Sequence, residues 1–212
     1  MNDLPQEATD VLSGVSRWAV VCGDSLEVMR QLPDGCVDAV VTDPPYGIGY
    51  KSGNATGGKW ASVRHSGVKI LGDDEPFDPS PLLAFNVPTV LWGANFYSDR
   101  LPGGGGFVWD KREGIEEMEF NRSDAELAYF SESKTVKTFR HLWHGLCRKT
   151  EVGKHLHPTQ KPVALMEWCI KQCKLPDGAT IIDPYAGSGS TGVAAVQMGY
   201  RFLGIEREPA YV

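Results

Sequence analysis

The sequence lacks any run of about 18 consecutive apolar residues, the length that a membrane-spanning helix needs. Its start, MNDLPQEATDVLSG, also lacks the basic and apolar regions of a signal peptide. We therefore expect a cytoplasmic protein with no membrane partner, in which residues 1–16 form a loose lead-in.

The 212 residues, 42% of them hydrophobic, suit one domain with a sizeable core. The last residues, EREPAYV, stop where a helix should begin, so we expect a further tail beyond them.

Cysteine is scarce, and its spacing does not indicate a metal site. The five cysteines include no CxxC pair. Cys169 and Cys173 are four positions apart on an expected helix, but no second pair of ligands accompanies them. We interpret the cysteines as reduced core thiols and expect neither zinc nor disulfides.

An overall excess of basic charge is also missing. The net charge of −6 argues against a broadly basic nucleic-acid binder. Between Lys134 and Lys161, however, seven Lys and Arg residues and four histidines stand against one acid, Glu151. Such a strip can bind phosphates while the rest of the surface stays acidic, although an ordinary solvated face gives the same pattern.

Strand-like and helix-like segments alternate along the chain. Short apolar runs predict strands at 18–22, 37–42, 89–92, 107–109, 180–182 and 202–205, and a β pair formed by 125–130 and 135–143. Helical spacing predicts helices at 26–32, 162–174 and 190–198, the second of them with a proline at its start. This alternation predicts an α/β fold, with a doubly wound, mostly parallel sheet and helices on both faces.

Two glycine-rich stretches interrupt this pattern. The four glycines 103–106 predict a turn. Residues 47–79 are rich in Gly, Ser, Asp and Pro and show little periodicity. A loop of that length inside a compact domain is usually functional or disordered.

The stretch IIDPYAGSGSTGVAAVQMGYRFLGIERE, residues 181–208, has the features of a nucleoside site. Gly187, Gly189 and Gly192 satisfy G-x-G-x-x-G between a strand and a helix, and Glu206 follows at the end of the next strand. Such glycines let a ligand approach the backbone, and the acid binds ribose hydroxyls. A phosphate-binding P-loop is excluded because no lysine precedes the Ser-Thr pair. The preceding Asp183-Pro184 favours S-adenosylmethionine over a nicotinamide cofactor, although the pattern alone does not decide.

The stretch VVTDPPYGIG, residues 40–49, fits an exocyclic amine. Pro44 and Pro45 have no N–H and force extended geometry on the residues before them, so the turn presents acceptors. Asp43 and the Pro44 carbonyl would accept the two N–H protons of an adenine N6 amine, and Asp43 or a water would take the departing proton. Tyr46 would stack on a base that has left the duplex. A rigid turn that merely ends the strand is the alternative.

Together these motifs resemble the amino-methyltransferases of DNA, which methylate adenine N6 or cytosine N4 with S-adenosylmethionine. DPPY, at 43–46, is similar to their catalytic motif and DPYAGSGST, at 183–191, to their cofactor motif. This order is the permuted one of the beta class. HPTQKPVALMEWCI at 157–170, GDSLEVMRQLPDGCVDAVVTDPPY at 23–46 and FLGIERE at 202–208 also resemble segments of that class. The resemblance covers residues 17–212 and implies a single Rossmann-like methyltransferase domain.

The resemblance implies roles for individual residues. Asp43, Pro44 and Tyr46 would hold the target base, and Pro45 would shape the turn. Asp24 would lie by the cofactor adenine, Glu206 would bind the ribose, and Thr159 and Lys161 would reach the methionine carboxylate. The remaining cofactor-binding residues would be Asp183, Pro184, Tyr185, Ala186, Gly187, Ser188 and Gly189. Tyr185 departs mildly from the family, which usually has phenylalanine at this position.

We expect a small DNA-recognition region, because the segment 139–156 is short for a target-recognition region. Double-stranded DNA would then be bound by cations of the basic strip and of the long loop. The residues predicted for this role are Lys51, Lys59, Arg64, Lys137, Arg140, Arg148 and Lys149.

The resulting hypothesis is a site-specific DNA adenine-N6 methyltransferase, because Asp in the first motif position is typical of adenine enzymes. Cytosine N4 is the close alternative. A NAD-dependent oxidoreductase would leave DPPY and HPTQKP unexplained, and a non-enzymatic nucleic-acid binder fits poorly with the negative charge. Little room exists for a nuclease domain, which favours a solitary methyltransferase, and the resemblance suggests a homodimer.

Overall fold

The computed structural model describes residues 4–49, 71–117, 123–144, 147–152 and 160–212. A sheet of eight strands forms its centre, in the order β1-β10-β9-β2-β3-β5-β4-β6. In that order the strands are β1 (Trp18–Cys22), β10 (Arg201–Glu206), β9 (Thr180–Asp183), β2 (Ala39–Thr42), β3 (Thr89–Trp92), β5 (Ala125–Phe130), β4 (Gly105–Asp110) and β6 (Val136–Arg140). Within this sheet only β5 is antiparallel to its neighbours. The other strands therefore run the same way, and their carboxyl ends share one edge.

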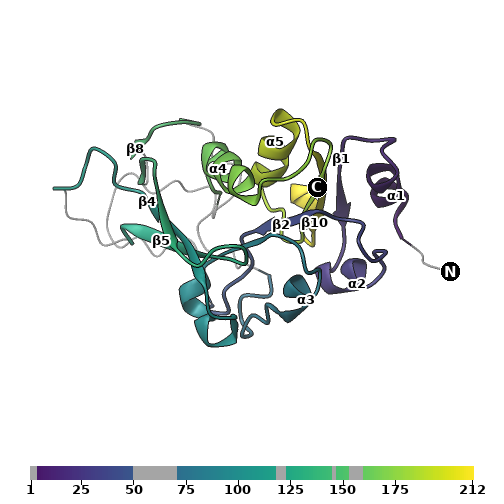
Figure 1. Ribbon diagram of the computed structural model, residues 1–212, viewed down its shortest axis with the longest axis horizontal. Helices are drawn as coiled ribbons and strands as arrows, with labels where there is room; N and C mark the ends of the chain where they lie inside the picture. Colours follow the sequence, from purple (N-terminus) through teal and green to yellow (C-terminus); the bar gives the residue numbers. More distant parts are fainter. Residues whose placement is uncertain (1–3, 50–70, 118–122, 145–146, 153–159) are drawn as a thin grey trace.

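Helices cover both faces of the sheet, as predicted. Figure 1 shows α4 (Val163–Cys173) and α5 (Ser190–Gln197) on one side, and α2 (Ser25–Met29) and α3 (Ser80–Leu83) on the other. The shorter turns are η2 (Ala94–Phe96), η3 (Ser98–Arg100) and η4 (Pro209–Tyr211). The α/β class and the mostly parallel sheet are confirmed.

The apolar runs form strands because each central strand is covered on both sides. β2, β3 and β9 are buried at every position, which is typical of parallel strands between two helical layers. Successive side chains still alternate between two cores. In β2, Val41 packs in the core under α4 and α5, whereas Val40 packs in the core on the opposite face.

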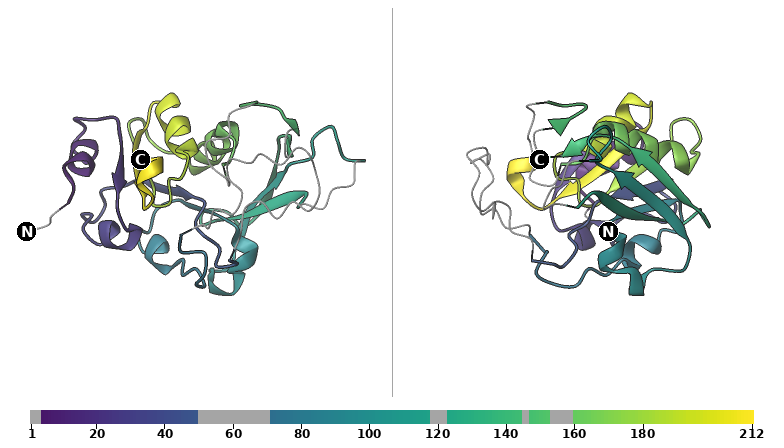
Figure 2. Two further views of the ribbon diagram at one scale, coloured as in Figure 1. Left: turned by 180° about the vertical axis from the view of Figure 1, so that it is seen from behind. Right: turned by 90° about the vertical axis from the view of Figure 1, so that its left-hand side faces the viewer.

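The expected loose lead-in over 1–16 is wrong. Residues Gln6–Leu12 form α1, which contacts β1 and β10. Ala8 and Val11 are fully buried there, three positions apart on one helical face. Figure 2 shows α1, in purple, at the opposite end of the molecule from the teal and green strands of the β4–β6 region.

The expected β pair of 125–130 with 135–143 is also wrong, because β4 lies between β5 and β6. Trp109 of β4 is paired with Glu126 on one side and with Phe139 on the other. Gly105 and Gly106 belong to β4 and do not form the predicted turn. A Cβ on Gly105 would lie 2.1 Å from the Thr135 carbonyl oxygen, so these glycines allow close backbone approach.

The segment after β6 forms a small hairpin. Trp143 belongs to β7 (Trp143–His144), which pairs with β8 (Cys147–Arg148). Cys147 and Cys22 are exposed, so the expectation of core thiols is wrong for these two, whereas Cys169 and Cys173 are buried in α4. Among the described residues, none of the helices is long and apolar enough to cross a membrane.

Candidate active site

The two sequence motifs meet at the carboxyl edge of the sheet. β2 and β9 are neighbours, with Val40 paired to Ile182, so Asp43 after β2 lies beside Asp183 at the end of β9. The Thr42 hydroxyl donates a 2.6 Å hydrogen bond to the Asp183 carboxylate and joins the two strand ends. Residues 140 positions apart in the chain are thereby brought together at the carboxyl edge of the sheet, which is where open α/β sheets bind ligands.

Asp43 is held by two partners. The Lys161 ammonium forms an ion pair with Oδ2, and the Tyr46 hydroxyl donates to Oδ1 at 2.5 Å. The Lys161 Nζ also lies 3.3 Å from the Tyr46 hydroxyl oxygen. The Lys161 side chain is only 6% exposed, so it is not the surface lysine that its position before a helix would otherwise suggest.

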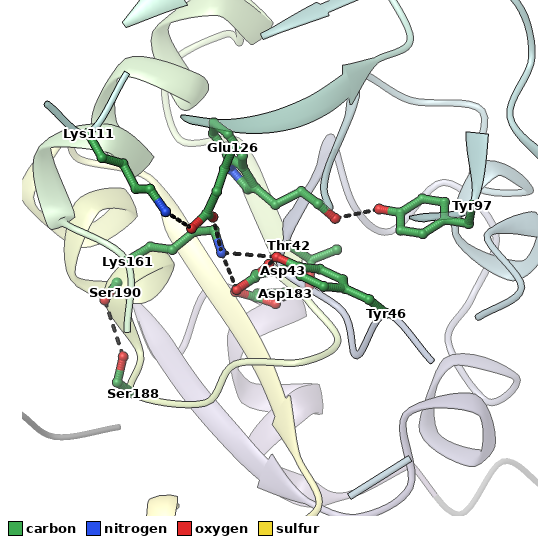
Figure 3. A network of polar contacts seen from close by, with 11 residues as sticks. Thr42, Asp43, Tyr46, Tyr97, Lys111, Glu126, Lys161, Asp183, Ser188 and Ser190 are labelled. Atoms are coloured by element: carbon green, nitrogen blue, oxygen red, sulfur yellow. Dashed lines mark hydrogen bonds and ion pairs between the residues drawn. The ribbon is translucent and has the colours of Figure 1, made fainter. Parts of the chain in front are cut away.

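Lys161 has a second acidic partner that the sequence did not reveal. Its Nζ lies 3.2 Å from Glu126 Oε2, and Glu126 Oε1 accepts a 3.0 Å hydrogen bond from Lys111. Figure 3 shows the resulting chain of alternating charges, from Lys111 through Glu126 and Lys161 to Asp43. The available sequence signal was the strand parity of Glu126, which shares a face with the buried Ala128 and Phe130.

The two carboxylates of this row of charges, Asp43 and Glu126, have pKa values shifted in opposite directions. Burial raises the pKa of Asp43, even though the Lys161 ammonium opposes the shift. Burial also acts on Glu126, but Lys161 and Lys111 together overcome it and lower the pKa of Glu126 to about 2. For Lys161, burial would lower the pKa, yet the charges of Asp43 and Glu126 raise it. Lys161 is therefore charged, and Asp43 is the more easily protonated acid.

The Tyr46 ring is fixed by its surroundings. It stacks on Phe96 with ring centroids 5.0 Å apart and an interplanar angle of 16°. Gly93 lies against the ring edge with φ +76°, and a Cβ there would fall 2.0 Å from Tyr46 Cε1. Burial raises the pKa of Tyr46, so the phenol stays neutral and donates to Asp43. Phe96 and Gly93 are two further residues that sequence reasoning missed.

The two ends of the predicted loop 47–79 are tied together by Asp73, another missed residue. Its carboxylate accepts hydrogen bonds from the N–H groups of Gly47, at 2.8 Å, and Ile48, at 3.4 Å. The Gly49 N–H donates to the Asp73 carbonyl at 2.7 Å. The turn that follows Tyr46 is therefore anchored to the loop's return segment.

The glycine turn is joined to Glu206, the acid at the end of the next strand, by a hydrogen bond. Gly187 and Gly189 have φ of +50° and +76°, and α5 starts directly after them. The Glu206 carboxylate accepts from the Gly187 N–H and the Glu208 N–H, each at 2.8 Å. After β1, the next strand along the sheet, Asp24 caps α2 by accepting from the Leu26 and Glu27 N–H groups.

Asp183 is a buried acceptor under this turn. In addition to Thr42, it accepts from the Tyr185 N–H at 3.1 Å. Burial raises its pKa to about 6. The backbone of Pro184 is also held, because its carbonyl accepts a hydrogen bond from the Ser25 hydroxyl. Close by, the Ser188 and Ser190 hydroxyls are 3.3 Å apart.

The cations predicted to bind DNA have local partners. The Lys149 Nζ is 3.0 Å from both carboxylate oxygens of Glu113, and the Arg140 Nε is 3.6 Å from Asp110. The Arg148 guanidinium lies 4.0 Å over the Trp143 ring, and Lys137 bonds Gln172 at 2.6 Å. Lys51, Lys59, Arg64 and Thr159 lie outside the described residues.

The chain matches a known protein family. Residues 89–212, more than half of it, match a family model for N6/N4 enzymes described as "DNA methylase". The chain belongs to the N6/N4 DNA methylases. The Type II methyltransferase M.ScaI of Streptomyces caespitosus is 27% identical to this methylase, over 90% of this chain and 77% of its own.

Solved structures show the same fold. The M1.HpyAVI–SAM complex is 23% identical with a TM-score of 0.52, covering 92% of this methylase and 95% of its own chain. The cytosine-N4-specific PvuII DNA methyltransferase is 15% identical with a TM-score of 0.58, covering 92% and 84%. These likenesses confirm the Rossmann-like methyltransferase fold.

Proposed function

We propose that this methylase transfers a methyl group from S-adenosylmethionine to the N6 amine of an adenine that has left the DNA duplex. The observation that carries the proposal is the meeting of Asp43 with the Asp183 glycine turn, joined through the Thr42–Asp183 hydrogen bond. An amine acceptor and a nucleoside-binding turn at one strand edge are the two halves of such a reaction. Family membership removes the grounds for an oxidoreductase or a non-enzymatic binder.

The chain's own residues fit the cofactor. The left-handed glycines open the backbone at the end of β9, and the Glu206 carboxylate beside them retains lone pairs for ribose hydroxyls. Asp24, at the end of β1, is 38% exposed at its side chain and lies beyond Glu206 on the same edge. S-adenosylmethionine, which accompanies the M1.HpyAVI neighbour, supplies an electrophilic methyl on a sulfonium.

Lys161 fits its predicted role less simply. An ammonium has three N–H donors, and in the structure Lys161 contacts three acceptors: Asp43, Glu126 and the Tyr46 hydroxyl. A methionine carboxylate would therefore compete with these three partners for the Lys161 ammonium. Its contact with the cofactor therefore stays a prediction, as does that of Thr159.

At the target amine, Asp43 would accept one N–H and the Pro44 carbonyl the other. These acceptors draw the nitrogen toward tetrahedral geometry and free its lone pair for attack. Tyr46, held by Gly93 and Phe96, would offer its ring to the base. The proton released on transfer would leave through Asp43 or a water.

The test compares wild type with Asp43→Asn and Asp43→Ala. Each protein is incubated with duplex DNA and radiolabelled S-adenosylmethionine, and the methylated DNA is digested for nucleoside mass spectrometry. We expect N6-methyladenine from wild type and a loss of at least about a hundredfold in both variants. Wild-type activity in Asp43→Ala would refute the assignment.

Cytosine N4 is the second candidate, because the matched family spans both amines. The same digest decides between them, since N4-methylcytosine would replace N6-methyladenine. Sequencing of methylated DNA from expressing cells would give the target site. Sedimentation of the protein with and without DNA would test the predicted homodimer.

A further inference from the structure

We propose that Glu126 is a positioning residue for methyl transfer: it holds the Lys161 ammonium in place against Asp43 and is itself held by Lys111. This inference rests on the proposed function, because it concerns the carboxylate that would accept the target amine. Glu126 does not contact Asp43 directly by any described hydrogen bond. It acts through Lys161, which lies between the two acids (Figure 3).

The position of Glu126 in β5 is unusual for a carboxylate. It is paired with the buried Trp109, and it shares a face with Ala128 and Phe130, which pack in the core under α4. The neighbouring Leu127, which is apolar, points outward and is 41% exposed. A charge turned toward a core is costly unless it is paired, so the pairing with two lysines explains how Glu126 is tolerated.

Three separate elements bring these charges together. Lys111 directly follows β4, Glu126 lies in β5, and Lys161 immediately precedes the N-cap of α4. Lys111 and Lys161 bind different oxygens of Glu126, at 3.0 and 3.2 Å. Such two-sided contact fixes the carboxylate, and with it the position of the Lys161 ammonium.

The charges of the four side chains Lys111, Glu126, Lys161 and Asp43 balance. Two ammonium groups stand beside two carboxylates, and Lys161 is shared between both acids. Without the charge of Glu126, Lys161 would serve Asp43 alone, and Asp43 would lose a repelling neighbour. Without Lys111, Glu126 would compete more strongly for Lys161, and Asp43 would lose nearby positive charge. The two changes therefore act on Asp43 with opposite signs.

Other groups also face Asp43 and stay constant in this comparison. They are Tyr46 after β2, Tyr97 between η2 and η3, and Asp183 at the end of β9. Neither substitution touches them, so the shifts report the charges that Glu126 and Lys111 present to Asp43, and the kinetic experiment tests the positioning through Lys161.

The first experiment uses the free full-length protein and needs no activity. Carboxyl ¹³C signals of labelled aspartate are titrated by NMR, and the Asp43 signal is identified by its absence in Asp43→Asn. Glu126→Gln should move the Asp43 midpoint to lower pH and Lys111→Met should move it to higher pH. Glu126→Asp, which keeps the charge, should return the midpoint toward the wild-type value. Unmoved midpoints, or shifts of the same sign, would overturn the inference.

The second experiment measures methyl transfer to duplex DNA against pH. Glu126→Gln should lower kcat by about ten- to a hundredfold with little change in KM for DNA, because misplacing a catalytic partner has such effects. The acid limb of its profile should shift opposite to that of Lys111→Met. Matched controls are Glu132→Gln and Lys171→Met, at exposed positions away from the site, which should behave as wild type. Thermal melting verifies folding.

The two experiments separate the inference from the proposed function. If wild type transfers no methyl to DNA, the proposed function fails, and the NMR midpoints still decide whether Glu126 and Lys111 set the state of Asp43. If wild type is active but Glu126→Gln matches its kcat and pH profile, the positioning role is refuted and the function stands.

Discussion

At the scale of single residues, Tyr46 combines a hydroxyl that bonds Asp43 with a ring stacked on Phe96. The two parts have separable roles in the proposed reaction. The hydroxyl helps to orient the carboxylate, whereas the ring provides the surface for a base. Phe96 already occupies one ring face, so a stacked base would take the opposite face or the place of Phe96.

This division predicts different costs for two substitutions. Tyr46→Phe keeps the ring and should reduce kcat by a few-fold, in line with the loss of one hydrogen bond of about 1 kcal/mol. Tyr46→Ala removes the stacking surface, worth about 1–3 kcal/mol per base, and should reduce kcat/KM further, by up to about a hundredfold. Steady-state methylation of duplex DNA measures both. Equal losses in the two variants would contradict a stacking role.

Asp183 predicts a pH dependence of stability. Its pKa is raised from 3.8 to about 6 by burial, so the protonated form is favoured in the folded state. Its contribution to stability is complete below pH 3.8 and is lost as the pH rises through 6. Asp183→Asn has no charge to bury. Between pH 4 and 7 the free energy of unfolding of the variant should rise relative to wild type by about 2–3 kcal/mol.

Urea unfolding of both proteins across this pH range measures the difference. Asp34→Asn, at an exposed position, is the matched control and should follow wild type. Parallel stability curves for wild type and Asp183→Asn would show that Asp183 is not strained by burial.

At the scale of elements, the connection from β3 to η2 shapes the site through Gly93. A left-handed residue is needed here, and the ring of Tyr46 fills the space where a Cβ would project. Gly93→Ala should therefore displace the ring and lower methyl transfer by about tenfold or more. Gly114→Ala is a close control, because its φ is +81° but nothing lies within 4 Å of the added Cβ.

Both variants carry the same backbone penalty, of about 1–2 kcal/mol for an L-residue in this conformation. Melting temperatures should thus fall in both, whereas activity should fall chiefly in Gly93→Ala. The intrinsic fluorescence of the variants gives a further comparison. Similar activity in the two proteins would mean that the packing of Gly93 on Tyr46 is unimportant.

Elements were predictable from the sequence where local patterns determined them. The central strands are apolar throughout because helices cover both their faces, and α4 begins after a proline, as expected. Helix α1 was missed because seven residues with two buried side chains give little periodic signal, and its stability comes from packing. The order β5-β4-β6 was missed because hairpin neighbours were assumed to pair, whereas β4 intervenes.

The site was predictable to the extent that motifs are contiguous. Asp43, Tyr46 and Glu206 stand in short patterns with chemical meaning. Glu126, Lys111 and Asp73 stand in none, and they become recognisable only when the fold brings them to partners many positions away. No local pattern predicts that Lys161 is paired with an acid 35 residues earlier in the chain.

At the scale of the whole molecule, the charge distribution sets how this methylase would meet DNA. Its net charge is −6, so attraction to phosphates has to be local. Arg140 ends β6, and the hairpin with Arg148 follows, so these cations lie past the same carboxyl edge as Asp43. Acids nevertheless pair with some of them, as Glu113 does with Lys149.

This arrangement predicts opposite effects for the two members of that pair. If Lys149 contacts a phosphate, Lys149→Met should weaken DNA binding on all sequences and reduce the slope of log affinity against log salt by about 1. Glu113→Gln should strengthen binding at low salt, because it frees Lys149 and removes a repelling charge. Lys171→Met, on α4 and outside the predicted DNA-binding set, should leave the slope unchanged. Fluorescence anisotropy at several salt concentrations measures all three. An unchanged slope in Lys149→Met would show that Lys149 does not contact a phosphate. Arg148, which lies over the Trp143 ring, would then be the next residue to test.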